Sequence, residues 1–282
     1  MNAMSIKFEK STEEIYRLLV DGIRRFFEPL SAKKATLGLS GGLDSAVVLA
    51  LAVEALGAKN IKVLLMPSEY STVHSVTDAV QMADTLNVAY DIVEITPVFR
   101  EFNRSLLPVF KGKEHDVTEE NLQARIRGTL LMALSNKLGY ILLNTSNKSE
   151  LAVGYGTLYG DLCGALSVIG DIYKTQAYDL ARFINQDQEV IPVNIIQKVP
   201  SAELRHDQKD SDSLPDYDIL DTILFMLVER GMSEEDILKQ GVDSHLLGRV
   251  ISLTKTNTFK ALQCSPVIKI SSKPLVPQYK WV

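Results

Sequence analysis

The sequence is poor in the residues that mark secreted, membrane and nucleic-acid-binding proteins. Its 282 residues include two cysteines, Cys163 and Cys264, which form neither a zinc spacing nor a disulfide framework, so we expect a reducing cytoplasm. No run approaches the ~20 apolar residues that a membrane span requires, and no signal-peptide core is visible at the N-terminus. A formal net charge of −5 argues weakly against an obligate DNA or RNA partner.

Apolar residues make up 46% of the chain, which is enough for a sizeable core. In the first half, apolar runs typical of strands alternate with helical patterns. We expect strands at residues 35–39, 61–66, 90–95 and 140–144, and helices at residues 11–30, 45–56, 73–86 and 119–138. This alternation predicts an α/β fold with a doubly wound, mostly parallel, Rossmann-like sheet, in which ligands bind at the carboxyl ends of the strands.

We expect a single domain over residues 1–282, with a nucleotide-binding core at residues 11–200. Residues 201–282 should supply a lid loop and a C-terminal helical cap. Residues 202–216 are polar and nearly devoid of apolar residues. We expect the lid at about residues 205–214, which lack apolar anchors and should be mobile until ATP binds; a flexible polar linker is the alternative. Helical patterns resume at residues 216–230, 233–240 and 243–255.

The most informative segment lies at the end of the first predicted strand. It comprises Gly38, Leu39, Ser40, Gly41, Gly42, Leu43, Asp44 and Ser45. A glycine-rich turn between a strand and a helix lets backbone N–H groups and the helix N-terminus surround a phosphate. No lysine follows the glycines, so this is not a Walker loop. Serine, aspartate and glycine would also suit an ordinary helix cap.

Asp44 adds a second requirement, because a carboxylate repels phosphate unless a cation lies between them. It therefore predicts a bound divalent metal ion, with Mg²⁺ as the cofactor. Residues 67–68 and 145–150 follow two other predicted strands directly, so they should lie on the same rim of the sheet.

The S-G-G-x-D-S pattern resembles the pyrophosphate loop of the ATP pyrophosphatases, which cleave ATP between the α and β phosphates. Three further motifs narrow this resemblance: T-S-N-K-S-E at residues 145–150, Y-G-D at residues 159–161 and D-I-Y-K-T at residues 171–175. Together they resemble the NAD synthetases over about residues 11–270. Glu150, Asp161 and Lys174 keep the spacing of that family.

The resemblance implies a ligase that forms a carbon–nitrogen bond. In that family ATP adenylates deamido-NAD with release of pyrophosphate, and ammonia then displaces AMP to give NAD. Adenylation spreads charge over the departing pyrophosphate, so catalysis needs cations and preorganised donors. The ATP contacts implied here are residues 38–45, Met66, Thr145, Lys174 and Ser201.

The resemblance also assigns roles in the chemistry. It implies that Asp44 and Glu150 hold Mg²⁺ and that Lys174 neutralises phosphate charge as a flexible cation. Asp161 would position ammonium and take its proton, because only the neutral amine can attack. Each of these residues has an ordinary alternative: a charge in the first turn of a helix, a turn aspartate or a solvated lysine.

The implied contacts with deamido-NAD are Arg125, Leu158, Asp161, Ala165, Phe259 and Lys260. Ammonia-dependent enzymes usually have lysine where Leu158 stands and aspartate where Ala165 stands, so this run looks more like the glutamine-dependent enzymes. Those enzymes carry an additional nitrilase-like glutaminase domain. We expect this domain to be absent here, because the S-G-G loop begins at Ser40. We therefore expect a stand-alone synthetase that uses ammonia, with a separate glutaminase partner left open. The family also implies a homodimer whose substrate site spans both subunits.

Two other functions remain to be distinguished. One is another ATP pyrophosphatase, such as a GMP synthetase-like or tRNA-thiolating enzyme; two isolated cysteines and a net charge of −5 do not suit thiolation. The other is a non-catalytic nucleotide-binding regulator. Binding alone needs no second metal carboxylate, so the presence of both Asp44 and Glu150 favours an enzyme.

Overall fold

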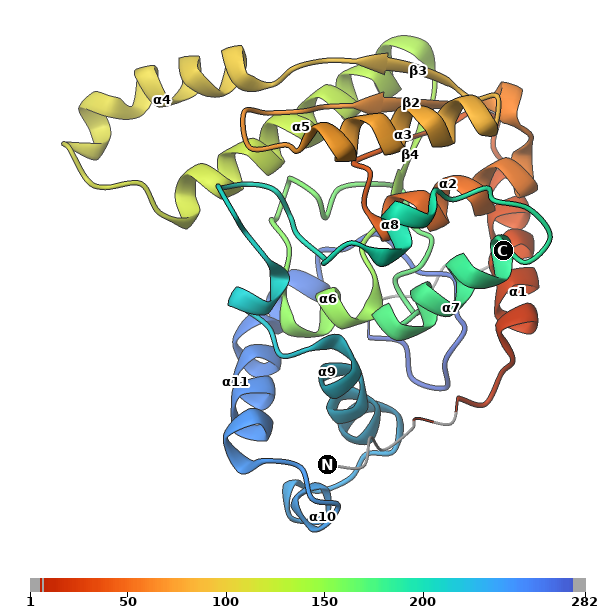
Figure 1. The fold of residues 1–282 in the computed structure, drawn as a ribbon, viewed down its shortest axis with the longest axis vertical. Helices are drawn as coiled ribbons and strands as arrows, with labels where there is room; N and C mark the ends of the chain where they lie inside the picture. Colours follow the sequence, from red (N-terminus) through yellow and green to blue (C-terminus); the bar gives the residue numbers. More distant parts are fainter. Residues whose placement is uncertain (1–5, 7, 276–282) are drawn as a thin grey trace.

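A parallel β-sheet forms the centre of the molecule. The computed structural model describes residue 6 and residues 8–275, and within them five strands follow the order β3-β2-β1-β4-β5 (Figure 1). They are β1 (Ala35–Gly38), β2 (Ile61–Leu65), β3 (Ala89–Ile92), β4 (Ile141–Asn144) and β5 (Leu166–Ser167). All strand pairs are parallel, and the four strands expected from the sequence lie side by side, so the predicted α/β class is confirmed.

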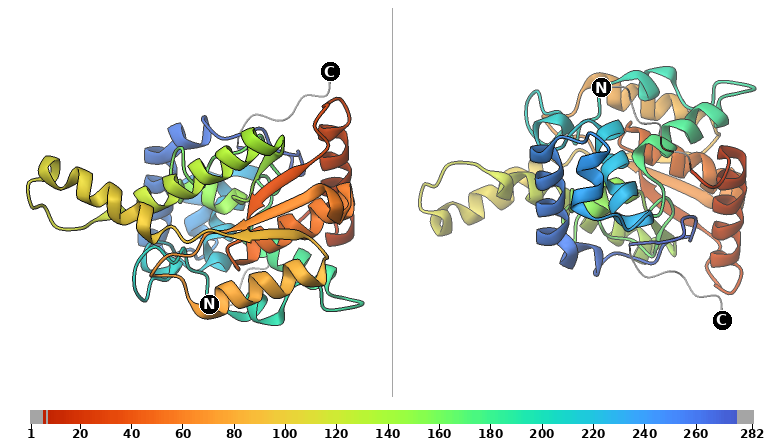
Figure 2. Two further views of the ribbon diagram at one scale, coloured as in Figure 1. Left: turned by 90° about the horizontal axis from the view of Figure 1, so that it is seen from above. Right: turned by 90° about the horizontal axis from the view of Figure 1, so that it is seen from below.

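Helices cover both faces of this sheet, as Figure 2 shows. One face carries α1 (Thr12–Phe27), α2 (Leu43–Leu56), α3 (Val73–Thr85) and α7 (Lys174–Ile184), which share an apolar cluster with the strands. The other face carries α4 (Thr96–Phe110) and α5 (Val117–Leu138), which pack over Leu64 and Leu142 in a separate cluster. Burial on both faces explains why the strands are almost continuously apolar.

The remaining helices lie mostly below the sheet in the view of Figure 1. They are α6 (Lys148–Val153), α8 (Val193–Gln197), α9 (Tyr217–Leu224) with a π-helical turn (Phe225–Glu229), α10 (Glu234–Lys239) and α11 (Ser244–Ala261), and two 3₁₀ turns occur at Ala58–Asn60 and Asp210–Asp212. Helices α9, α10 and α11 pack with α6 around a further apolar cluster. Across the part of the chain that the structure describes, no helix is both long enough and apolar enough to cross a bilayer.

The sequence analysis missed some elements and misjudged the lid. It did not predict α4, because several apolar side chains of that helix are exposed and Pro108 interrupts its pattern. It did not predict β5, whose two residues are too short to show a period. The expectation that residues 205–214 lack apolar anchors is wrong, since Leu214 is buried against α9.

A buried lysine ties the C-terminal segment to α6. Lys148 is fully buried, and its ammonium pairs with Asp171 at 3.0 Å and with Glu229. The same ammonium donates to Ser271 Oγ at 2.8 Å, and Asp171 accepts from the Ile270 N–H at 2.8 Å. These contacts compensate three buried charges and hold the C-terminal segment beside the sheet.

We predict that Lys148→Met lowers the free energy of unfolding by about 3–5 kcal/mol, because it leaves Asp171 and Glu229 without their cation in a buried place. Urea denaturation followed by circular dichroism would measure the change. Lys239→Met is the matched control, since that lysine pairs with Glu235 at 2.9 Å on the surface and should leave the midpoint unchanged. Equal midpoints for both variants would contradict a structural role for Lys148.

Candidate functional site

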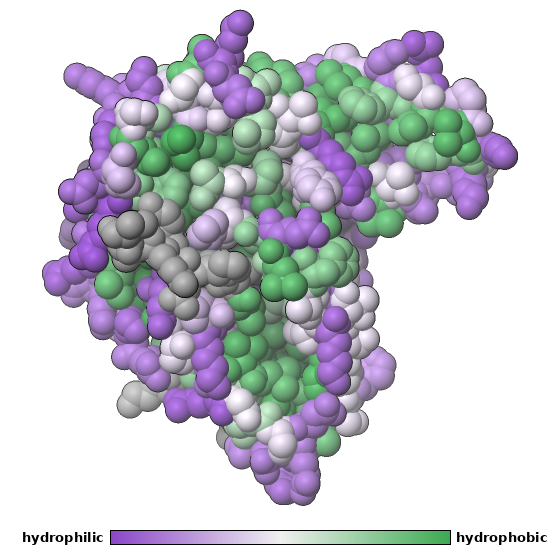
Figure 3. Space-filling model, turned by 180° about the vertical axis from the view of Figure 1, so that it is seen from behind, coloured by the Kyte–Doolittle hydropathy of each residue, from purple (hydrophilic) through white to green (hydrophobic). Residues whose placement is uncertain are grey.

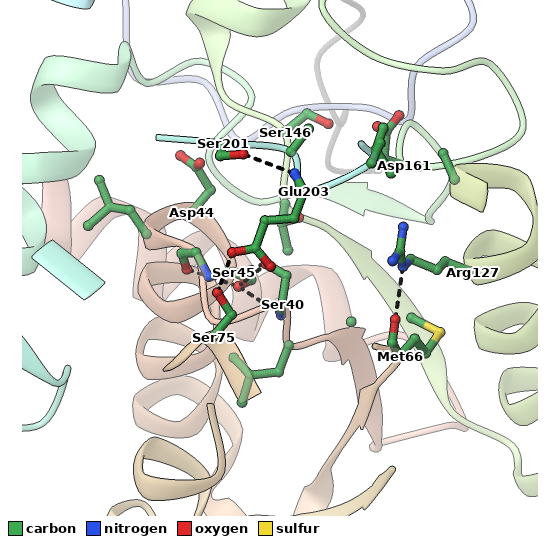
Figure 4. Close-up of a pocket in the computed structure, with 18 of the residues that line it drawn as sticks. Ser40, Asp44, Ser45, Met66, Ser75, Arg127, Ser146, Asp161, Ser201 and Glu203 are labelled. Carbon is green, nitrogen blue, oxygen red and sulfur yellow. Dashed lines mark hydrogen bonds between the residues drawn. The ribbon is translucent and has the colours of Figure 1, made fainter. Parts of the chain in front are cut away.

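The carboxyl ends of β1, β2 and β4 open into a cavity of about 290 Å³. Figure 4 shows Ser40, Asp44, Met66 and Ser201 around it. The structure brings together the residues expected to contact ATP, with Gly41 set back from the surface of the cavity. Those that line it are Gly38, Leu39, Ser40, Gly42, Leu43, Asp44, Ser45, Met66, Thr145, Lys174 and Ser201.

The glycine-rich loop turns sharply beneath this cavity. Gly41 has a φ of +75°, and a Cβ atom there would lie 2.2 Å from the Ser75 carbonyl oxygen, so only glycine fits. Ser45 Oγ donates to the Gly42 carbonyl at 3.0 Å and lies 3.2 Å from Ser40 Oγ. Within the described residues, no side chain caps α2 at Gly42, so the first N–H groups of this helix stay free for an anion.

Lys174 and two carboxylates form a charged centre beside the loop. Lys174 is 4% exposed, and its Nζ lies 2.5 Å from Asp44 Oδ2 and 3.8 Å from Glu150 Oε1. Burial alone would lower the pKa of Lys174, but Asp44 and Glu150 hold this pKa above its ordinary value. Burial and the charge of Asp44 raise the pKa of Glu150. The lysine therefore stays charged, and in this structure both carboxylates hold it in place.

Further hydrogen bonds hold this centre from behind. Ser149 Oγ accepts from the Lys174 N–H at 2.9 Å and donates to Asp221 Oδ1 at 2.5 Å. Asp221 Oδ2 also accepts from the Thr175 N–H at 2.9 Å, so a carboxylate from α9 caps the start of α7. Burial raises the pKa of Asp221 to about 6. Asn147 Nδ2 donates to Asp44 Oδ1 at 3.0 Å and fixes the other side of the ion pair.

Asp161 lies across the cavity from Asp44 (Figure 4). The residue keeps solvent access, yet protein atoms surround its carboxyl, and this burial raises its pKa. The Thr157 N–H donates to Asp161 Oδ1 at 2.6 Å and the charge of Lys260 lies nearby, and both effects oppose that rise. Arg127 lies on the same side and donates to the Met66 carbonyl at 3.0 Å; burial lowers its pKa to about 10.

The other residues expected to contact deamido-NAD lie outside the cavity lining of the described structure. Arg125 is exposed and donates to the Leu158 carbonyl at 3.2 Å, while Arg127 is the arginine that reaches the cavity. Residues two apart on a helix do not share a face, which explains the difference between these arginines. Ala165 and Phe259 are exposed as well, and Lys260 Nζ donates to the carbonyls of residues 154 and 156 at 2.8 and 2.9 Å.

Sequence reasoning did not find the residue that holds the lid segment (residues 200–214) across the cavity. Glu203 accepts hydrogen bonds from Ser75 Oγ at 2.6 Å, from Thr72 Oγ1 at 3.1 Å and from the Thr72 N–H at 3.2 Å. Figure 4 shows its carboxylate next to Ser75, between Asp44 and Arg127. The motif around Ser201 marked this segment, but no pattern in the sequence names the start of α3 as its partner.

The parallel sheet, the S-G-G loop after β1 and the buried lysine–carboxylate centre define an α/β protein with a candidate anion-binding site at its strand ends. The model of the NAD synthase family matches residues 15–264. The chain therefore belongs to the NAD synthase family.

Curated relatives agree with this family. The chain is 45% identical over 262 residues to a glutamine-dependent NAD(+) synthetase of Synechocystis, with 93% of this chain and 47% of the relative covered. It is 47% identical over 262 residues to the Acinetobacter baylyi enzyme of the same name, with 92% and 48% covered. The chain thus spans about half the length of the curated relatives it matches.

Solved structures show the same fold. An NH3-dependent NAD synthetase from Campylobacter jejuni has a TM-score of 0.73 and 31% identity, with 89% of this chain and 96% of that chain covered. A glutamine-dependent NAD+ synthetase from Acinetobacter baumannii, in complex with ADP, has a TM-score of 0.67 and 39% identity, with 99% and 52% covered. An NMN synthetase from Francisella tularensis has a TM-score of 0.76 and 26% identity, with 94% and 99% covered.

We predict that Gly41→Ala lowers the melting temperature more than Gly57→Ala. Both glycines have positive φ, so both variants carry backbone strain of about 1–2 kcal/mol. Only at Gly41 would the new Cβ meet backbone, because nothing lies within 4 Å of a Cβ at Gly57. Differential scanning calorimetry measures both melting temperatures. Equal decreases would show that the loop accommodates the Cβ at Gly41 without an additional loss of stability.

Proposed function

We propose that this chain is an NAD synthetase that converts deamido-NAD, ATP and ammonia into NAD, AMP and pyrophosphate. The observation that carries the proposal is the Lys174 ammonium held between Asp44 and Glu150 beside the S-G-G loop, with Asp161 on the same cavity. A GMP synthetase-like enzyme, a tRNA-thiolating enzyme or a non-catalytic regulator is not favoured, because the relatives are NAD synthetases.

The first half-reaction needs stabilisation of a departing anion. A nicotinate carboxylate oxygen forms a bond to the α-phosphorus of ATP, and the bond from that phosphorus to the bridging oxygen breaks to release pyrophosphate. The free N–H groups at the start of α2 and the hydroxyls of Ser40 and Ser45 suit the departing pyrophosphate. Lys174 is suited to contact the α-phosphate, because the ammonium stays protonated and its ion pair with Asp44 fixes its position.

The second half-reaction needs a proton acceptor. Ammonia forms a bond to the activated carbonyl carbon, the carbon–oxygen bond to AMP breaks, and the nitrogen loses a proton. Asp161 is our candidate to receive it, because a carboxylate with a raised pKa takes a proton more readily than one at its ordinary value. The negative charge of Asp161 would also favour ammonium near the cavity before it deprotonates.

Mg²⁺ fits the donor set beside Lys174. This ion is commonly held by one or two carboxylates together with substrate phosphates, and Asp44 and Glu150 supply two carboxylates at the phosphate rim. In the described part of the chain no group of three metal-binding side chains occurs, so nucleotide and water would have to complete the coordination. When bound, the ion would neutralise phosphate charge. We propose Asp44 and Glu150 as its ligands.

We propose ammonia as the nitrogen donor. An NH3-dependent NAD synthetase is among the structural neighbours, whereas the curated relatives are glutamine-dependent and twice as long, so a separate glutaminase partner is a possible source of that ammonia. The test is NAD formation by the purified chain with ammonium or with ammonia-free glutamine. We expect NAD, AMP and pyrophosphate with ammonium alone. Activity with glutamine alone would contradict ammonia as the nitrogen donor. Inactivity with both nitrogen sources would contradict the proposed NAD synthetase function.

The same assay should compare two nicotinate substrates, because one structural neighbour is an NMN synthetase. We expect the dinucleotide deamido-NAD to be used far better than nicotinate mononucleotide. A preference for the mononucleotide would replace NAD synthetase with NMN synthetase as the function of this site.

We also propose a cytoplasmic homodimer. The free thiols of Cys163 and Cys264 suit a reducing compartment. Helix α4 and the turn that follows it project from the body of the molecule (Figures 1 and 2), and Figure 3 shows hydrophobic side chains on this projection. The exposed apolar residues of α4 are Val98, Phe102, Leu107 and Val109, and Val117 is exposed at the start of α5. An exposed apolar surface of this kind favours contact with a second copy.

We predict that Leu107→Glu combined with Val109→Glu converts a dimer into a monomer, because charges would replace the most exposed apolar side chains of the projection. Sedimentation velocity of the wild type and the variant measures the change. Leu238→Glu on α10 places a charge on a surface away from the projection and serves as the control. A variant that sediments like the wild type would place any interface elsewhere.

We predict that Asp44→Asn lowers the rate of pyrophosphate release by at least about a hundredfold while the fold stays intact. The variant removes the charge that holds Lys174 and one proposed ligand of Mg²⁺. Pyrophosphate release and circular dichroism are measured with magnesium in excess. Asp84→Asn, an exposed change on α3, is the control. Wild-type turnover in Asp44→Asn would refute the assignment.

We predict that Asp161→Asn spares adenylation and slows amide formation by about 10²–10⁴-fold, because it removes the proposed proton acceptor. A single-turnover experiment compares pyrophosphate release with NAD formation across ammonium concentrations. Accumulation of the adenylate, or its loss to water, is the expected result. If both half-reactions fall equally, Asp161 serves nucleotide binding, and the role of proton acceptor is withdrawn.

A further inference from the structure

One acidic residue of the lid segment is buried although its neighbours are exposed. Asp210 is 6% exposed, and both of its carboxylate oxygens accept hydrogen bonds from phenols. Tyr155 donates to Oδ1 at 3.0 Å, and Tyr217 donates to Oδ2 at 2.9 Å. Tyr155 follows α6 and Tyr217 begins α9, so Asp210 joins the lid to two helices behind the cavity.

Tyr217 connects this carboxylate to the charged centre. Its ring lies under the Lys174 ammonium, with Nζ 5.2 Å from the ring centroid, a distance that suits a cation–π contact. Asp44 and Glu150 contact the same ammonium. Burial and the charges of Glu150 and Asp210 raise the pKa of Tyr217, so the phenol keeps the proton that it donates.

Two carboxylates of the lid segment, Glu203 and Asp210, have different partners. Glu203 bonds to Ser75 and Thr72 at the start of α3, whereas Asp210 bonds to the tyrosine that touches Lys174. Both oxygens of Asp210 accept hydrogen bonds from phenols, and one of these phenols belongs to the ring beside Lys174. If Asp210 served only to hold the lid in place, its partner Tyr217 would not need to contact Lys174. The contact between Tyr217 and Lys174 therefore indicates a second role for Asp210.

We propose that Asp210 is a positioning residue that couples the lid to Lys174. With the lid across the cavity, the Asp210 carboxylate fixes the Tyr217 ring against the Lys174 ammonium. When the lid moves away, Tyr217 loses its hydrogen-bond acceptor. Its ring is then no longer fixed against the Lys174 ammonium. Adenylation is thereby favoured in the covered state, where water is excluded from the adenylate. This inference rests on the proposed synthetase function.

The kinetic test uses Asp210→Ala, Tyr217→Phe and the double variant. We expect each single variant to slow pyrophosphate release in a single turnover by about 10- to 100-fold, because a displaced catalytic group loses its orientation. ATP affinity, measured by calorimetry, should change less than about threefold, since the nucleotide contacts remain. The double variant should be no slower than the slower single variant, because both changes break one connection.

Two further variants separate positioning from fastening. Tyr155→Phe removes the other hydrogen bond to Asp210 and leaves the Tyr217 contact intact, so it should slow pyrophosphate release less than Tyr217→Phe. Arg205→Ala breaks lid ion pairs with Glu120 and Asp212 on the surface and should leave the rate unchanged. Equal effects of Tyr155→Phe and Tyr217→Phe, additive effects in the double variant, or weaker ATP binding at an unchanged rate would overturn the proposal.

A spectroscopic arm requires no activity. Protons above an aromatic face resonate upfield, so the ε-protons of ¹³C-labelled Lys174, assigned with Lys174→Arg, report the Tyr217 ring. We expect an upfield signal in the wild type and in Tyr155→Phe, its loss in Tyr217→Leu, and a shift toward that lost position in Asp210→Ala. An unchanged signal in Asp210→Ala would overturn the coupling. An enzyme inactive in every assay would instead overturn the synthetase function, and this signal would still decide the coupling.

Discussion

The buried ion pair between Lys174 and Asp44 is the contact on which the site depends. Lys174 begins α7 and Asp44 lies in the first turn of α2, so the pair fixes two helices on one face of the sheet relative to each other. Either charge alone would be costly to bury. Two carboxylates, Asp44 and Glu150, face one ammonium, which leaves the centre short of positive charge. A cation that arrives with a nucleotide would correct that deficit, whereas a free phosphate would worsen it.

The lid completes the site from outside and carries backbone strain. Glu203 and Asp207 both have positive φ, at 49° and 53°, which is unfavourable for residues other than glycine. The contacts of Glu203 with α3 and of Asp210 with Tyr217 offset that cost only while the lid lies across the cavity. The stretch between Glu203 and Asp210 is held by polar contacts, so it can release while Leu214 stays in the apolar cluster with α9. These contacts therefore suit a cover that must admit one nucleotide and release another.

The sequence predicted those parts of the fold that depend on local pattern. Apolar runs and the S-G-G turn placed four strands and the rim correctly, because strand ends and glycine turns are local features. The partner of Asp44 could not be read in this way, since Lys174 lies 130 positions further along the chain. The Mg²⁺ predicted at Asp44 stays a prediction, and the structure adds the Lys174 ammonium beside that carboxylate. Likewise, Arg127 rather than Arg125 reaches the cavity, and only the rotation of α5 decides between them.

The residues expected to contact deamido-NAD then raise a geometric question. Asp161 lines the cavity, but Arg125, Phe259 and Lys260 lie outside it on the described structure. In the proposed function, a dinucleotide with its nicotinate end at Lys174 would have to extend past Asp161 toward those residues. There the surface of one chain is open, and Tyr159 is 73% exposed. A long substrate gains little from an open surface, because its polar groups remain in water. The proposed dimer would supply the missing wall, so the oligomeric state would decide how tightly the substrate is held.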